Sequence, residues 1–205
     1  MTFQDFRIAF QSYPIISVME VEKLFPGFDR KNLVYWQGKN LIQKIRNGWY
    51  RLTEKPVDAE MLFFISNQIY QPSYISLETA LSVYGFIPEG VFRITAVSTL
   101  KTQQFQTPIG HFGYRNIRES LFFGYQIRPV GSFFYKMADP EKALLDFFYL
   151  NPSLNADSHF EGLRLNFLEI KRSVDFQKWD QYLDLIDSAS LGKRAKIFKK
   201  FIEKQ

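Results

Sequence analysis

The pattern of apolar and polar positions is clearest between residues 29 and 52, where a helical spacing runs directly into a strand spacing. Leu33 and Trp36 are three positions apart, so they share one face of a predicted helix, which we expect to be buried. Asp29 is suited to cap the start of this helix, because its side chain can accept a hydrogen bond from the first turn. Asn40 suits the left-handed residue that ends a helix.

Two runs of β-forming residues, Leu41–Ile45 and Trp49–Leu52, follow this helix. The Asn47-Gly48 pair between them favours the positive φ angles of a type I′ turn, and this predicts a tight hairpin. Ile15 and Ile16 lie upstream and are expected to add a short third strand to the hairpin.

Two more helices are predicted before residue 29. Thr2 with Asp5 can cap the first, and Ser17 with Glu20 forms a capping box for the second. Helices followed by a basic hairpin in this order are typical of a winged helix-turn-helix, which we predict for residues 1–56.

A second domain is predicted for residues 57–205, after the Lys55-Pro56 boundary. Helices are expected over residues 58–69, from Ser76 to Gly85 and from Asp139 onwards. The β-region is expected over residues 91–137, in four runs of β-branched and aromatic residues: Val91–Thr99, His111–Ile117, Tyr125–Val130 and Phe133–Met137.

A short strand near Leu163–Ile170 and two helices are expected to complete the chain. The predicted fold class is therefore α+β, with an N-terminal winged helix-turn-helix followed by a mixed α/β domain that ends in helices.

The charge is unevenly distributed along the chain. Residues 1–56 contain nine Lys and Arg against five Asp and Glu, whereas the remainder contains seventeen against sixteen. The basic excess therefore coincides with the predicted winged helix, as binding to a DNA duplex requires. The absence of cysteine excludes disulfides and thiolate metal sites. No segment approaches the roughly 18–20 apolar residues that span a bilayer, so we expect a soluble cytoplasmic protein without a membrane partner.

Eight polar residues are candidates for contact with DNA because they lie away from the Leu33 and Trp36 face or on the hairpin. The predicted helix contributes Arg30, Lys31, Asn32, Tyr35 and Lys39, and the hairpin contributes Lys44, Arg46 and Asn47. Asn32 is suited to an adenine edge and Arg30 to a guanine edge, while the hairpin residues are suited to phosphate or to the minor groove. Docking of a protein is the alternative use of such a helix and hairpin.

Catalytic signals are weak. Glu169 and Lys171 have the alternate spacing that places a carboxylate and an ammonium on one strand face, and Asp157 precedes them by twelve residues. A metal-dependent nuclease is therefore a minor alternative. The chain has no P-loop, no G-x-G-x-x-G and no G-x-S-x-G motif. We expect a protein that is not an enzyme, with no catalytic residue, no cofactor and no metal.

Four segments of the second predicted domain carry a family resemblance: Tyr74–Glu89, Ile94–Thr102, Phe112–Arg118 and Ala138–Asp146. Together with the predicted winged helix, they make the chain, over roughly residues 10–150, similar to the AbiEi family of antitoxins from type IV toxin–antitoxin systems.

The resemblance implies a bacterial protein with two activities. The winged helix would bind double-stranded operator DNA, as a possible homodimer, and repress its own operon. The C-terminal domain would counteract a cognate toxin that resembles a nucleotidyltransferase, with or without direct binding. The alternative is a DNA-binding regulator whose second domain senses a ligand or dimerises and has no toxin partner.

Overall fold

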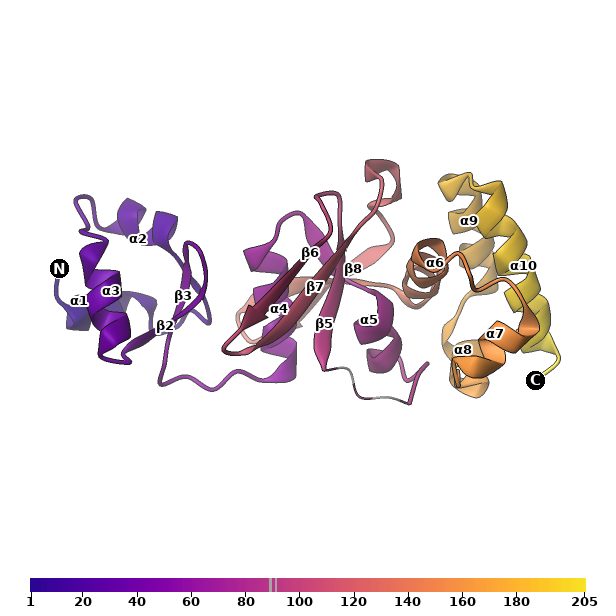
Figure 1. Ribbon diagram of the computed structural model, residues 1–205, viewed down its shortest axis with the longest axis horizontal. Helices are drawn as coiled ribbons and strands as arrows, with labels where there is room; N and C mark the ends of the chain where they lie inside the picture. Colours follow the sequence, from indigo (N-terminus) through magenta and orange to yellow (C-terminus); the bar gives the residue numbers. More distant parts are fainter. Residues whose placement is uncertain (89, 91) are drawn as a thin grey trace.

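Three helices and a small sheet form one end of the elongated molecule in the computed structural model, which describes residues 1–88, 90 and 92–205 (Figure 1). In chain order these elements are α1 (Phe3–Phe10), β1 (Ile16–Ser17), α2 (Val18–Leu24), α3 (Lys31–Gly38), β2 (Ile42–Arg46) and β3 (Trp49–Leu52). The strands form an antiparallel sheet in the order β1-β3-β2. We refer to residues 1–56 as the N-terminal unit.

The local signals in this unit act largely as predicted. Both capping boxes are present, at Thr2 with Asp5 and at Ser17 with Glu20. Asn40 has the expected left-handed conformation, with a φ of 55°. The predicted type I′ turn is wrong, because Gly48 has a φ of 80° whereas Asn47 does not have a positive φ. A register shift accompanies this turn, so the hairpin closes with a β-bulge that increases its twist.

The second unit, residues 57–205, is built around a six-stranded mixed sheet in the order β6-β7-β5-β4-β9-β8. Its strands are β4 (Ser73–Ile75), β5 (Arg93–Ser98), β6 (Gln103–Thr107), β7 (Gly110–Asn116), β8 (Tyr125–Val130) and β9 (Phe133–Ala138). The pairs β4–β9 and β5–β7 are parallel, and the other neighbouring pairs are antiparallel. We refer to these residues as the C-terminal unit.

Helices cover both faces of this sheet (Figure 1). Helix α4 (Ala59–Ile69) lies on the face towards the N-terminal unit, and α5 (Leu77–Val83) and α6 (Pro140–Leu150) lie on the other. A short 3-10 turn, η1 (Glu119–Leu121), precedes β8. The chain then ends in α7 (Asp157–Gly162), α8 (Phe167–Ser173), α9 (Phe176–Ile186) and α10 (Ala189–Glu203), of which α9 and α10 pack on α6.

The predicted α+β class is confirmed, and the four predicted β-runs correspond to β5, β7, β8 and β9. Val91, the first residue of one predicted run, lies outside the described residues. Strands β4 and β6 were not predicted, because β4 has only three residues and β6 is rich in glutamine.

The predicted strand at Leu163–Ile170 is wrong. Arg164 has a positive φ of 50°, and the Asn166 side chain accepts a hydrogen bond from the Glu169 backbone N–H at 3.2 Å. This cap starts α8, so a local side-chain hydrogen bond overrides the alternating pattern.

Helix α6 carries a lysine and an aspartate that are almost completely buried. Lys142 donates hydrogen bonds to the Asp146 carboxylate one turn later and, at 2.7 Å, to the Tyr74 hydroxyl. Asp146 also accepts hydrogen bonds from the hydroxyls of Tyr74, at 2.9 Å, and Ser76, at 2.8 Å. Burial raises the pKa of Tyr74 well above its ordinary value, so this hydroxyl stays protonated and able to donate. The network joins β4 to α6, and both charges have polar partners.

A second polar cluster joins α6 to α9. Lys178 on α9 forms ion pairs with Asp139 at 2.8 Å and with Glu141 at 3.0 Å, and the Tyr182 hydroxyl donates to Asp139 at 2.7 Å. Burial by itself would lower the pKa of Lys178. The hydrogen bonds to both carboxylates outweigh this effect, and the pKa is raised above its ordinary value. Burial and the Asp139 carboxylate raise the pKa of Tyr182 to about 12. Both groups therefore keep their protons across the physiological pH range.

We expect Lys142→Met to lower the free energy of unfolding by about 3–5 kcal/mol, because it leaves the Asp146 carboxylate buried without its cation. The double variant Lys142→Met/Asp146→Leu should lose less free energy of unfolding than Lys142→Met alone, since it leaves no unpaired charge. Urea unfolding followed by circular dichroism measures both values. Lys204→Met, in the exposed pair of Lys204 with Asp157, serves as the control and should change little. A double variant that is less stable than the single would contradict the expectation.

Candidate nucleic-acid interface

Helix α3 presents one buried and one exposed face. Leu33 and Trp36 are each 3% exposed, as predicted, and the Trp36 ring lies 4.9 Å from that of Phe6. Four residues at helical spacing form the exposed stripe of α3: Lys31, Val34, Tyr35 and Gly38. Val34 is 71% and Tyr35 58% exposed, so two neighbouring apolar side chains lie on the solvent side of α3.

Val34 was missed by the sequence reasoning, which looked for polar side chains. The signal that could have found it is its position, one residue after Leu33 and two before Trp36, which places it away from the buried face. Met19 at the start of α2 was missed in the same way and is 78% exposed.

Arg30 lies just before α3 and is held by the preceding helix. Its guanidinium donates two hydrogen bonds to the Glu22 carboxylate on α2, at 2.5 and 3.0 Å. The hydrogen bond from Arg30 lowers the pKa of Glu22, so the carboxylate stays ionised. Arg30 is exposed, but its charge is paired, so this geometry favours positioning of α3 on α2 over reading of a guanine edge.

The other predicted helix residues are distributed around the exposed stripe. Lys31 and Lys39 are exposed, and the Lys39 ammonium lies 4.6 Å from the centre of the Tyr35 ring. Asn32 is half-buried. Among the described residues, neither lysine forms an ion pair, so both remain available to phosphate.

The hairpin turn lies close to the starts of α2 and α3. The Val18 backbone N–H donates to the Gly48 carbonyl at 2.9 Å, which ties the turn to α2. Lys44 and Asn47 are exposed. A hollow of about 490 Å³ is lined by residues of α2, α3 and the turn, including Met19 and Val34, and by Arg30 just before α3. The structure thus brings α3 and the hairpin turn to the two sides of one groove.

Arg46 is the exception among the predicted hairpin contacts, because its side chain points to the C-terminal unit. It donates a hydrogen bond to the Ile69 carbonyl at the end of α4, and its guanidinium lies 4.2 Å from the centre of the Phe105 ring and 5.4 Å from that of Tyr70. The expected phosphate contact by Arg46 is therefore corrected to a contact between the two units.

Apolar packing accompanies Arg46 at this contact. Ile15 and Ile45 are 3% and 5% exposed and belong to the large buried cluster of the C-terminal unit, although they lie in the N-terminal sequence. The Tyr13 ring lies 6.2 Å from that of Phe133. One face of the hairpin is thus covered, whereas the turn and Lys44 remain exposed.

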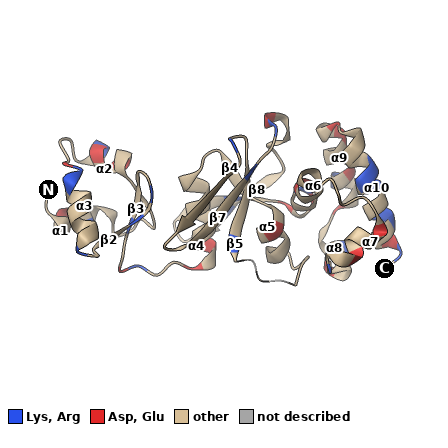
Figure 2. Ribbon diagram, viewed as in Figure 1, with Lys and Arg blue, Asp and Glu red and all other residues tan. Residues whose placement is uncertain are grey.

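Figure 2 shows basic residues on several elements, among them the N-terminal end of α3 and α10. Arg30 and Lys31 lie at that end of α3 in the sequence, and α10 carries a series of lysines and one arginine. Arg194 on α10 is buried, and it donates to the Phe148 carbonyl at 3.2 Å. The basic pattern of α10 is therefore partly structural.

The candidate nuclease residues do not form a site. Glu169 and Lys171 lie two positions apart on a helix, where their side chains diverge, rather than on a strand. Asp157 on α7 pairs with Lys204 at 3.4 Å. Within the described part of the chain, no group of three or more His, Asp or Glu residues is placed to hold a metal ion.

Comparison with models of known protein families and with curated proteins finds no match for this chain. Among the described residues, no helix combines the length and the apolar composition needed to cross a membrane.

We expect Arg46→Ala to loosen the contact between the two units, because it removes the hydrogen bond to Ile69 and the cation–π contact with Phe105. Together these are worth about 1–2 kcal/mol. Limited proteolysis with a non-specific protease should then cleave residues 53–58 faster. The matched control is Lys44→Ala, which alters an exposed neighbour on the same strand. Equal cleavage rates for the two variants would contradict this assignment of Arg46.

Proposed function

We propose that this protein is a DNA-binding repressor of its own operon that also acts as an antitoxin. The observation that carries the DNA-binding part is the exposed stripe of α3 beside the basic, exposed side of the hairpin turn. The order helix, short strand, two helices and a two-stranded hairpin is the order of a winged helix-turn-helix. In that class the second helix of the pair enters the major groove and the hairpin contacts the flanking backbone.

The exposed residues are proposed to contact different parts of the DNA duplex. Lys31 and Lys39, at the two ends of α3, are placed for phosphates on either side of the major groove. Tyr35 and Val34 between them are placed for base edges, and the Val34 methyl groups suit the methyl group of thymine. Lys44 and Asn47 supply the hairpin contact, while Arg30 fixes α3 through Glu22.

The antitoxin part rests on the sequence resemblance. Two of the segments that carry it, Tyr74–Glu89 and Ala138–Asp146, are joined by the buried network of Tyr74, Ser76, Lys142 and Asp146. This arrangement supports the view that they act as one structural unit. The proposed partner is a nucleotidyltransferase-like toxin, and the C-terminal unit is proposed to counteract it without catalysis of its own.

We expect Lys31→Ala/Lys39→Ala to weaken binding to the DNA upstream of its own gene. The salt dependence should fall as well: the slope of log K against log salt should decrease in magnitude by about 2, since two phosphate contacts are lost. Fluorescence anisotropy between 50 and 200 mM salt measures both the affinity and its salt dependence. Over this range, a difference of about 2 in slope changes the affinity ratio of the two proteins by about tenfold. Lys101→Ala/Lys171→Ala removes the same charge from exposed positions of the C-terminal unit and is the control. If the two double variants lose the same DNA affinity, the assignment of Lys31 and Lys39 to phosphate contacts is wrong.

The two proposed activities should be separable. In cells that express the toxin-like protein of the same operon, Lys31→Ala/Lys39→Ala should restore growth as well as the unaltered protein does, but should fail to repress a promoter reporter. Protein abundance is measured in parallel. If abundant unaltered protein represses the promoter and gives no rescue, the alternative holds, a regulator whose C-terminal unit senses a ligand or dimerises.

A further inference from the structure

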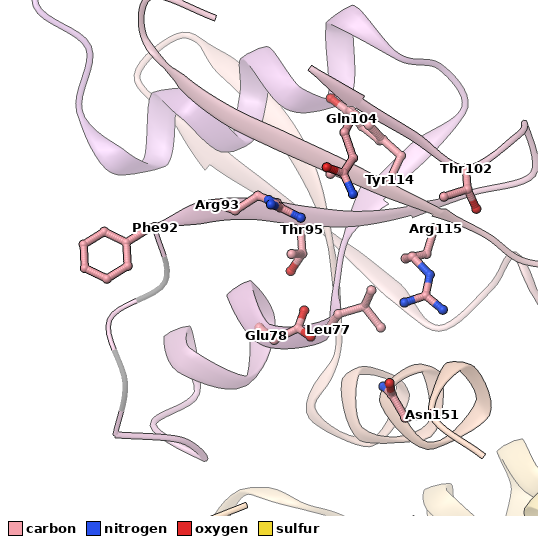
Figure 3. Close-up of a pocket in the computed structure, with 11 residues that line it drawn as sticks. Leu77, Glu78, Phe92, Arg93, Thr95, Thr102, Gln104, Tyr114, Arg115 and Asn151 are labelled. Atoms are coloured by element: carbon pink, nitrogen blue, oxygen red, sulfur yellow. The ribbon is translucent and has the colours of Figure 1, made fainter. Parts of the chain in front are cut away.

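A hollow of about 350 Å³ opens on the C-terminal unit, on the side of the sheet that carries α5 and α6 (Figure 3). Helix α5 packs mainly against β5 and α6, and the floor of the hollow is formed by residues of β5, β6 and β7. The polar residues that line it project from different elements and include Glu78, Arg93, Thr95, Gln104, Arg115 and Asn151. The volume lies at the lower end of the range for small-molecule sites.

Strand register explains why two arginines meet here. In the parallel pair β5–β7, Thr95 lies opposite Gly113. Since side chains alternate along a strand, Arg93 and Thr95 share one face with Gly113 and Arg115. A side chain at Gly113 would meet Arg93, because a Cβ built there lies 2.9 Å from the Arg93 Cδ atom. Glycine in the interior of β7 therefore lets the Arg93 stem lie across the strand.

The charges of this hollow are not balanced within the described part of the chain. Arg93 makes no side-chain hydrogen bond or ion pair there, and Arg115 makes only a 3.3 Å hydrogen bond to the Leu150 carbonyl at the end of α6. Figure 3 shows Arg115 between the sheet and Asn151, with Glu78 directed from α5 towards the sheet. Two guanidinium groups thus share a concave surface with one carboxylate.

We propose that this hollow binds a small molecule that carries a phosphate monoester. A dianionic phosphate matches two guanidinium groups in charge, and each group can donate paired hydrogen bonds to its oxygens. The Glu78 carboxylate repels a second phosphate and accepts hydrogen bonds, so it favours a hydroxyl or amino group on the rest of the ligand. Gln104 and Asn151 add donors and acceptors at the rim. A nucleotide and a sugar phosphate both have this chemistry.

The shape and charge favour a small ligand over a nucleic-acid strand. A strand would bring several phosphates to one surface, and Glu78 lies among the cations that would have to receive them. The site is separate from α3 and the hairpin, so the proposal does not depend on DNA binding or on a toxin partner.

Isothermal titration calorimetry on the full-length protein tests the site with adenosine 5′-monophosphate, ribose 5-phosphate and adenosine. We expect the monophosphate to bind and adenosine to bind at least tenfold more weakly. Arg93→Gln and Arg115→Gln should each lower the affinity for the monophosphate at least tenfold, whereas Glu78→Gln should raise that affinity. Arg172→Gln removes one positive charge from exposed α8 and should change nothing. All four positions are at the surface or the rim, and circular dichroism checks each fold.

Two outcomes assign the source of the phosphate. Preference for the monophosphate over ribose 5-phosphate identifies a nucleotide site, and equal binding identifies recognition of the sugar phosphate. Three outcomes overturn the proposal: no binding of either phosphate at millimolar concentration, equal binding of adenosine, or unchanged affinity in both arginine variants. A loss of DNA binding in those variants, with unchanged binding of the monophosphate, would assign the surface to nucleic acid instead.

Discussion

The buried ion pair of Lys142 with Asp146 is the constraint on which the C-terminal unit depends. An ammonium in an apolar interior is tolerated only where opposite charge and hydrogen-bond acceptors surround it, and here Tyr74, Ser76 and Asp146 must all be in place. Those residues come from β4, the start of α5 and α6. The network therefore fixes the centre of the sheet against its helical layer, and the same helix binds α9 through Lys178.

The contact between the two units restricts which surfaces of the N-terminal unit are accessible to a partner. Arg46, Ile15 and Ile45 use one face of the small sheet and hairpin to pack on the C-terminal unit. The exposed stripe of α3 and the hairpin turn lie away from that contact. Any partner of this stripe is therefore held at a defined position relative to the C-terminal unit. A ligand in the hollow beside Arg93 and Arg115 would bind on the far side of the sheet from α4, the helix that Arg46 touches (Figure 1).

Local structure could be read from the sequence wherever neighbouring residues decide it. The capping boxes at Thr2 and Ser17, the left-handed Asn40 and the Pro140 start of α6 all depend on interactions within a few residues. The error at Leu163–Ile170 arose because the spacing of apolar residues fits both a strand and a capped helix, and the Asn166 cap decides between them.

The sequence by itself determined the α+β class, the buried face of α3 and the concentration of basic charge in the first 56 residues, because composition and short-range spacing carry that information. Only the tertiary structure decided which cations are free. Arg30 is paired with Glu22 from another helix, and Arg46 is packed against Phe105, 59 positions further along the chain. It also decided that Arg93 and Arg115 share one hollow, because strand register joins residues that no local pattern connects.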